Sequence, residues 1–209
     1  LESVDRQDNV AVSFSNLYRF VRPHNLTGAK LYYAFNDNVD FHLYAANNLK
    51  DTVSTGVGTE SAMPAAGFRL GFNWGEGETK SSIGLSGAGS AEHPNHNTHY
   101  SFLGDLDVNW AINENFTLGG EFIYRQDNVL VAGAKNNKAM AAQLLAAYNF
   151  NESWGGYVRG GWLHDINPAG VYTNNDQQIY DWTVGFSYQI AEGAKVKLEY
   201  RGDYFADAI

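Results

Sequence analysis

Charged side chains recur at every second position in several stretches of this chain, with acids and bases in equal number. The acids are Asp40, Asp105, Asp107, Glu121, Asp181, Glu199 and Asp203. The bases are Lys30, Arg69, Arg125, Arg159, Lys195, Lys197 and Arg201. If these side chains share one wall, they either set the ion preference of a water-filled pore or pair across strands as stabilising salt bridges. Their balance favours weak ion selectivity.

Three histidines stand three residues apart in a polar stretch: His93, His96 and His99. Imidazoles are ligands for zinc or copper, and these three would bind an ion only if the loop folded around it. Pro94 stiffens the stretch, and the spacing matches no established metal site. The sequence therefore favours solvated loop histidines over a metal site, and we expect no cofactor.

Other kinds of chemistry find little support in the composition. The chain has no cysteine, which excludes disulfides and thiolate metal sites. His42 and His164 have polar neighbours, but no G-x-S-x-G nucleophile motif is present. A formal net charge of -9 argues against a nucleic-acid partner, which would favour a basic face. We therefore expect no enzymatic activity.

The stretch from Tyr180 to Ile190 shows which kind of element positions the charged side chains. Its even positions are apolar or aromatic, and its odd positions, beginning with Asp181, are polar or glycine. A period of two predicts a β-strand with one apolar and one polar face. The same alternation predicts eleven strands, near residues 10–20, 26–35, 38–47, 65–75, 80–87, 99–111, 115–126, 138–150, 153–163, 178–190 and 194–205.

The connections between these strands are of two kinds. Short polar turns stand at 36–38, 75–78, 113–115, 151–153 and 192–193, and longer connections lie at 48–63, 87–98, 127–137 and 164–177. Asn, Asp and Gly suit the short turns because they tolerate positive φ or bond to their own backbone. Short turns on one side and long loops on the other are typical of outer-membrane barrels.

Strand length and the segregation of side chains separate a membrane barrel from a soluble β-sandwich. Many of the expected strands match the ~9 to 11 residues that cross a bilayer and exceed the five or six typical of soluble sheets. Apolar residues such as Phe68, Leu106 and Phe122 lie on the parity opposite to the charges. Mean hydropathy is -0.36, and no stretch approaches the ~20 apolar residues of a spanning helix. We expect the apolar parity to face lipid and the polar parity to face water.

Aromatic residues cluster beside the short turns. They are Phe35, Trp74, Trp110, Phe116, Phe150, Trp154 and Tyr188. Amphipathic rings suit the headgroup region of a bilayer, so we expect an aromatic girdle on the turn side. A second girdle on the loop side would consist of Tyr44, Tyr100, Tyr124, Trp162 and Tyr180.

The stretch from Thr27 to Asn38 has the sequence TGAKLYYAFNDN and continues into Val39–Asn48. It resembles the OmpL-like β-barrel porins of the porin-2 group, in which a Thr-Gly-x-Lys/Arg strand leads through Tyr-x-Phe-Asn-Asp into a short turn. Hairpins at 144–154 and 184–200 share this character, and the likeness extends over most of the chain. The resemblance implies a bacterial outer-membrane channel and carries over no catalytic residue.

These observations predict an all-β fold, an antiparallel up-and-down transmembrane β-barrel, with residues 1–209 in a single domain. Eleven is an odd number, whereas closed single-chain bacterial barrels have an even number of strands. Either a twelfth strand lies in residues 1–9, or the chain is a segment of a larger barrel of 12–16 or more strands. We favour a segment. The opening residues 1–5 lack the apolar region of a signal peptide, which indicates a processed or truncated product.

We expect an outer-membrane porin through which ions and small polar solutes diffuse passively. Its partners would be the bilayer and those solutes, with self-association or an envelope protein left open. The alternative is a structural or scaffold barrel, plugged or partner-bound, that serves assembly or docking; about eight strands leave a filled interior and sixteen or more leave a channel. The pore-lining residues would be Lys30, Asp40, Arg69, Asp105, Asp107, Glu121, Arg125, Arg159, Asp181, Lys197, Glu199 and Arg201.

Overall fold

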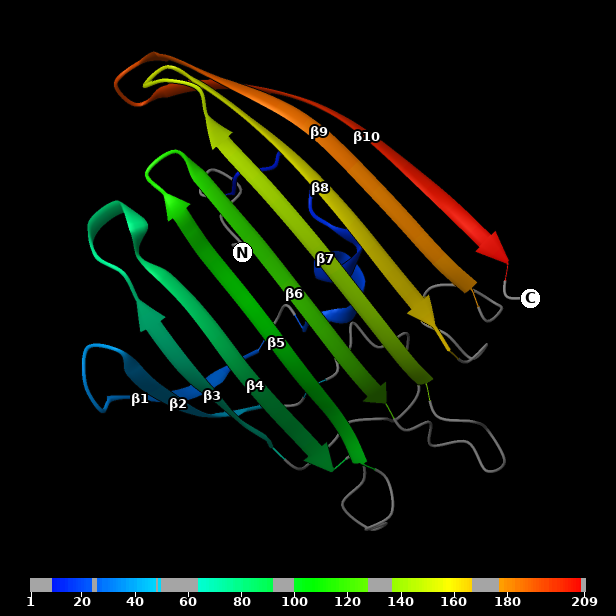
Figure 1. Ribbon diagram of the computed structural model, residues 1–209. Helices are drawn as coiled ribbons and strands as arrows, with labels where there is room; N and C mark the ends of the chain where they lie inside the picture. Colours follow the sequence, from blue (N-terminus) through cyan, green and yellow to red (C-terminus); the bar gives the residue numbers. More distant parts are fainter. Residues whose placement is uncertain are drawn as a thin grey trace.

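The computed structural model describes residues 9–23, 26–47, 49, 64–91, 100–127, 137–166 and 177–207. Each strand in these ranges pairs antiparallel with the next one in the sequence, so the sheet has no crossover. It curves into part of a barrel (Figure 1). The strands are β1 (Gly28–Ala34), β2 (Val39–Ala46), β3 (Ala65–Trp74), β4 (Ser81–Ala91), β5 (Tyr100–Asn113), β6 (Phe116–Asp127), β7 (Asn137–Asn149), β8 (Trp154–Asp165), β9 (Gln177–Ala191) and β10 (Ala194–Asp207).

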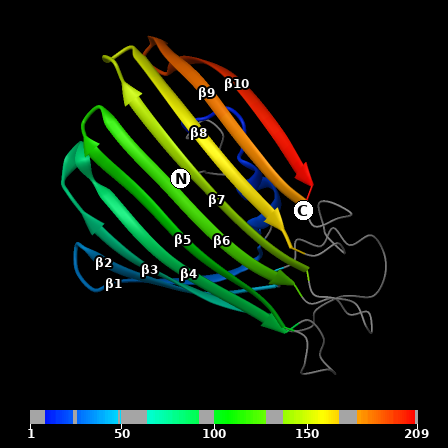
Figure 2. The ribbon, with the colours of Figure 1, turned by 45° about the vertical axis from the view of Figure 1, so that its right-hand side comes forward.

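The all-antiparallel, up-and-down architecture agrees with the expectation from the sequence, as do the lengths of most strands. Within the described residues β1 and β10 do not pair with each other, and the sheet is open. The five hairpin turns all lie at the same end of the sheet (Figures 1 and 2). The longer connections fall mostly on residues outside the described ranges, as does the twelfth strand considered for residues 1–9.

The strand expected at residues 10–20 is wrong, so the described strands number ten rather than eleven. Residues 9–22, called the inner segment below, lie within the curve of the sheet (Figure 2). They end in η2 (Leu17–Val21), a single π-helical turn. The alternation of Val10, Val12 and Phe14 imitates a strand, but side chains of the sheet, rather than a neighbouring strand, satisfy the backbone here. No helix in the described ranges is long and apolar enough to span a membrane.

In three of the hairpin turns an asparagine side chain accepts two hydrogen bonds from the backbone of the turn. In the β1–β2 turn, Asn36 Oδ1 accepts hydrogen bonds from the backbone N–H groups of Asn38 and Val39, both at 2.9 Å. Asn113 and Asn151 do the same in the β5–β6 and β7–β8 turns. The turns after β3 and β9 instead contain Gly75 and Gly193, each with a φ of 79°. The predicted turns are therefore confirmed, with the chemistry expected of Asn and Gly.

The two faces of the sheet differ as the residue parity predicts. On β7, Leu144 is 73% exposed on the convex face, whereas its neighbour Gln143 is 2% exposed on the concave face. The register continues each face across the sheet, with Leu106 opposite Phe122 and Val158 opposite Val184. One ring departs from the expectation. Tyr44 was expected in the loop-side girdle, but it shares the parity of the charged residues, and its ring packs over Gly67.

An apolar cluster lies between the inner segment and the concave face. Leu17 and Val21 of η2 are almost fully buried against side chains of β5 to β9, and Phe20 packs at the margin. The members contributed by the sheet are Leu103, Ile123, Ala139, Ala141, Leu163 and Ile179. Burying apolar surface stabilises this arrangement, so the cluster holds η2 against the sheet.

Candidate functional site

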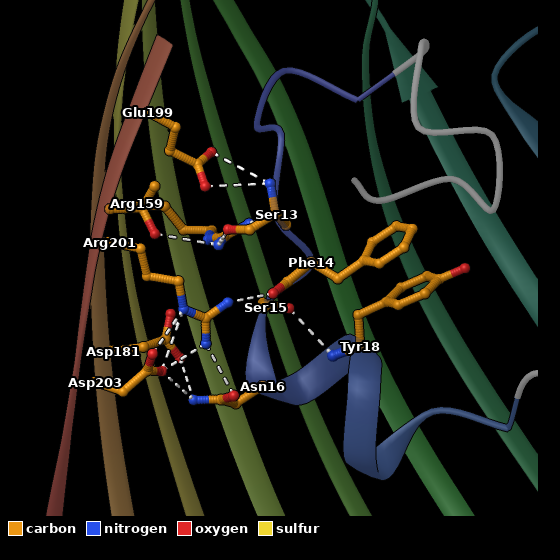
Figure 3. A network of polar contacts seen from close by, with 11 residues as sticks. Ser13, Phe14, Ser15, Asn16, Tyr18, Arg159, Asp181, Glu199, Arg201 and Asp203 are labelled. Atoms are coloured by element: carbon orange, nitrogen blue, oxygen red, sulfur yellow. Dashed lines mark hydrogen bonds and ion pairs between the residues drawn. The ribbon is translucent and has the colours of Figure 1, made fainter. Parts of the chain in front are cut away.

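The concave face brings together most of the charged residues expected to line a pore, and the inner segment lies on it (Figure 3). Glu199 on β10 accepts hydrogen bonds from the backbone N–H groups of Val12 at 2.8 Å and Ser13 at 3.1 Å. Arg159 on β8 donates to the carbonyl oxygen of Ser13 at 2.7 Å. Tyr157 donates its hydroxyl to Glu199 at 2.6 Å. The strands β8 and β10 thus hold the main chain of the inner segment.

A second group of contacts surrounds Asn16. Its side-chain Nδ2 donates to Asp181 at 3.0 Å and to Asp203 at 3.1 Å. Its side-chain Oδ1 accepts from Arg201 at 2.9 Å. Arg201 also pairs with Asp203 at 2.6 Å and donates to the carbonyl oxygen of Phe14. Asp181 is 4% exposed, and Asn16 donates a hydrogen bond to one oxygen of this buried carboxyl group.

The other charged group lies on β3, β5 and β6. Arg69 forms a bidentate pair with Asp107, one arm of which measures 3.0 Å. Arg22, at the end of the inner segment, pairs with Glu121 at 2.7 Å, and Gln143 donates to the other oxygen of Glu121 at 3.1 Å. Bidentate guanidinium–carboxylate pairs are geometrically specific and strong. The charged residues on the concave face, called the wall residues below, therefore pair with one another and with the inner segment.

Glycines on the concave face make room for the side chains of the neighbouring strand. A Cβ at Gly84 would collide with the guanidinium of Arg69, and one at Gly161 would collide with the carboxylate of Asp181. At Gly104, which lies on the convex face with the parity of Leu106, a Cβ would meet nothing within 4 Å. At Gly84 and Gly161 the absence of a side chain leaves room for the charged group of the neighbouring strand, a common reason for glycine inside a strand.

Two polar hollows lie on the turn side of the inner segment. One has a volume of ≈ 280 Å³ and includes Asn9, Asn109, Tyr157 and Lys197 in its lining. The other, of ≈ 880 Å³, lies among the turns and includes Glu114 and Trp154. The two share the lining residues Asn115, Asn149, Gly155, Ser187 and Lys195. Polar groups therefore continue from the edge of the inner segment to the turn end of the sheet.

Not every predicted residue joins these groups. Lys30 is exposed on β1, away from the inner segment. On β2, Asp40 accepts from Asn73 at 2.7 Å and lies 3.3 Å from His42. Arg125 pairs with Asp127 at 3.0 Å and also donates to the carbonyl oxygens of Val21 and Leu49. Asp105 follows the same parity as Asp107 on β5, and Lys197 donates to the carbonyl oxygen of Asn9.

The histidines considered as metal ligands, His93, His96 and His99, lie outside the described residues. In the ranges that the structure describes, no group of three His, Cys, Asp or Glu side chains is arranged to hold a metal ion.

Sequence reasoning missed the inner segment and the residues that bind it. Ser13 and Asn16, where a strand was expected, bind Arg159 and Asp181, and Arg22, just beyond that expected strand, binds Glu121. Two signals were available. Ile123, Leu163 and Ile179 are apolar residues on the otherwise polar parity, which indicates that something apolar covers them. Leu17 and Val21 stand four residues apart, the spacing of one helical face.

The rings beside the short turns are exposed, as a girdle would require, except that Phe116 is half-buried. Trp154 and Tyr188 pair across β8 and β9 with ring centroids 4.4 Å apart. Tyr148 lies 6.3 Å from Phe116 and 5.4 Å from Phe150. Phe35, Trp74 and Trp110 are also at least 40% exposed.

A curved antiparallel sheet that is apolar outside and charged inside has the design of a transmembrane β-barrel wall. Residues 1–208 match the family described as beta-barrel porin-2, OmpL-like. The chain belongs to this family, which confirms the resemblance seen at residues 27–48 and places the protein in the bacterial outer membrane.

Among solved structures, the chain is similar to the outer membrane channel DcaP of Acinetobacter baumannii, with a TM-score of 0.68 and 12% identity. The likeness covers 85% of this chain and 56% of the DcaP chain, so this chain spans little more than half the length of that protein. The Pseudomonas putida toluene transporter TodX matches with a TM-score of 0.33 and 12% identity, over 85% of this chain and 68% of its own. No curated protein matches the sequence. The likeness to DcaP supports the barrel fold.

Proposed function

We propose that the protein forms a water-filled channel through the outer membrane, through which ions and small polar solutes diffuse passively. The observation that carries this proposal is the segregation of the two faces: exposed apolar side chains on the convex face and charged pairs with polar hollows on the concave face. Water in contact with such a concave face offers solutes a polar route, whereas lipid suits the convex face.

In this channel the pore-lining residues act as fixed charges rather than as catalysts. The bidentate pair of Arg69 and Asp107 and the pair of Arg22 and Glu121 combine opposite charges, which favours weak ion selectivity. The rings near the turns, including Trp154 and Tyr188, would lie at the headgroups on that side of the bilayer. The single-domain organisation expected for residues 1–209 belongs to the same proposal.

The edges of β1 and β10 also bear on the proposed channel. An open edge in lipid would leave backbone N–H and C=O groups without partners, at a cost of several kcal/mol each. The channel that we propose is therefore a closed barrel in which these two edges have hydrogen-bonding partners.

The test is single-channel recording of the full-length protein in a planar bilayer under a salt gradient. Stable conductance steps with a small reversal potential would support a weakly selective channel. A large reversal potential would contradict the weak selectivity but not the channel. No conductance from protein whose insertion has been verified would contradict the channel.

One observation favours a second candidate, the plugged scaffold barrel. The inner segment lies on the concave face and is bound there by Glu199, Arg159 and Arg201. If it fills the lumen of the closed barrel, the inserted protein stays silent, and its role is assembly or docking. The recording described above separates the two candidates.

A further inference from the structure

The wall binds the inner segment largely through the segment's main chain. Glu199 accepts from the backbone N–H groups of Val12 and Ser13, and Arg159 donates to the carbonyl oxygen of Ser13. Arg201 donates to the carbonyl oxygen of Phe14. Three wall residues thus satisfy both donors and acceptors along the main chain of this stretch, which bends at residues 10–13 and forms no strand.

The same mode of binding continues beyond these residues. Lys197 donates to the carbonyl oxygen of Asn9, and Arg125 donates to that of Val21 at 2.9 Å. Hydrogen bonds in which one partner is charged are roughly twice as strong as neutral ones. Main-chain groups are the same in nearly every peptide, so this wall holds a backbone with little demand on its sequence. Side-chain hydrogen bonds from this stretch to the wall come from Ser13 and Asn16.

We propose that Glu199, Arg159 and Arg201 form a binding site for a peptide main chain, which residues 9–16 occupy in this protein and a short peptide solute takes when they leave. This inference rests on the proposed channel and names short peptides as a class of solute. The neighbouring hollow of ≈ 280 Å³, lined in part by Asn9, Val10 and Tyr157, provides the approach from the turn side.

Residues 9–16 are suited to exchange with another peptide. Val10 and Val12 are 41% and 42% exposed, and among the apolar side chains of residues 9–16 only the small Ala11, at 5%, is buried. The apolar anchor lies further along, at Leu17 and Val21. Weakening that anchor, or the contacts of Asn16, loosens the inner segment while leaving the wall residues that bind the main chain unchanged.

The probe is a peptide with the sequence of residues 9–16, acetylated and amidated at its ends, added to single channels of the full-length protein. We expect transient blockades, with an apparent affinity at least about tenfold higher in the variants Leu17→Asp and Asn16→Ala than in the unmodified protein. Asn16→Ala is the milder change and keeps the test usable if Leu17→Asp does not fold. In the loosened channel, Glu199→Gln combined with Arg159→Gln should lower the affinity again.

Modified peptides test whether the main chain is recognised. N-methylation at the positions of Val12 and Ser13 removes the two donors to Glu199 and should weaken the block about tenfold, whereas N-methylation at Val10, which is 41% exposed, should change it little. A peptide of the same composition in scrambled order, with the asparagine of its last position kept in place, should block about as well. Block by the original order alone, or block that N-methylation leaves unchanged, would overturn main-chain recognition.

A cross-link tests the location of the site. The chain has no cysteine, so Asn16→Cys with Asp181→Cys can be joined by a short reversible thiol cross-linker, since the two wild-type side chains lie 3.0 Å apart. Block should vanish in the linked state and return on reduction. Persistence of block in the linked state, or its absence from a conducting loosened channel, would refute the peptide site and leave the channel standing. Absence of conductance altogether would refute the channel itself.

Discussion

Arg69 and Asp107 show how single residues set the charge of the concave face. The two side chains come from β3 and β5, with Gly84 of β4 between them, and form a bidentate pair. Their side chains are 31% and 16% exposed, so the pair lies within reach of the solutes of the proposed channel. Since the partners cancel each other's charge, removing either one changes the fixed charge by one unit and leaves the other unpaired.

We predict that Arg69→Gln moves the reversal potential towards cation preference, because it leaves the Asp107 carboxylate uncompensated. Asp107→Asn should move it by a similar amount towards anion preference. The double variant should return close to the unmodified value, because the pair is removed as a neutral unit. Single-channel recording in a salt gradient measures all three. Shifts of the same sign in both single variants would contradict the prediction.

At the scale of the element, the asparagine turns define where strands end. Asn113 binds the backbone N–H groups of Asn115 and Phe116, and without it both donors lose a partner. We predict that Asn113→Ala lowers the free energy of unfolding by about 1–2 kcal/mol. Asn113→Asp keeps the acceptor oxygen and should cost much less. Urea titration of the inserted protein, followed by tryptophan fluorescence, compares the two; equal losses would argue against the capping role.

The strand β4 offers a test of packing between neighbours. We predict that Gly84→Ala destabilises the sheet by only about 1 kcal/mol, because the added methyl group displaces the flexible end of the Arg69 side chain and disturbs its pair with Asp107. Gly104→Ala, on the convex face of the next strand, serves as the control for the loss of a strand glycine, since a Cβ there has open space. Combining Gly84→Ala with Arg69→Ala should cost less than the sum of the separate changes. Strict additivity in urea titrations would show that the two positions do not interact.

The elements also show what the sequence could and could not predict. Alternation and turn chemistry located ten strands because each signal is local. The sequence from Tyr180 to Ile190, for example, shows an apolar and a polar face whatever strand lies beside it. The inner segment could not be located in the same way. Val10, Val12 and Phe14 alternate like a strand, but the partners of this backbone are side chains more than a hundred residues away, among them Glu199, Arg159 and Arg201. The role of the wall charges depends on that long-range contact.

At the scale of the whole molecule, the two faces meet different solvents. Leu144 and Leu145 are adjacent on β7; Leu144 is 73% exposed on the convex face, and Leu145 lines the polar hollow on the concave face. We predict that Leu144→Arg destabilises the inserted protein by about 2–4 kcal/mol, as charges do near the middle of a bilayer. Leu145→Arg should cost less and should move the reversal potential towards anion preference. Equal stability losses in lipid vesicles would contradict the assignment of the faces.

The connectivity of the sheet has a consequence for the order of assembly. Every strand pairs with its neighbour in the sequence, so the sheet can grow one hairpin at a time with short loops to close. The inner segment is different: Arg22 is separated from Glu121 by 99 residues, and Asn9 from Lys197 by 188. Its docking surface exists only once β8 to β10 have formed. Residues near the start of this chain, which leave the ribosome before those strands, therefore reach their final positions after them.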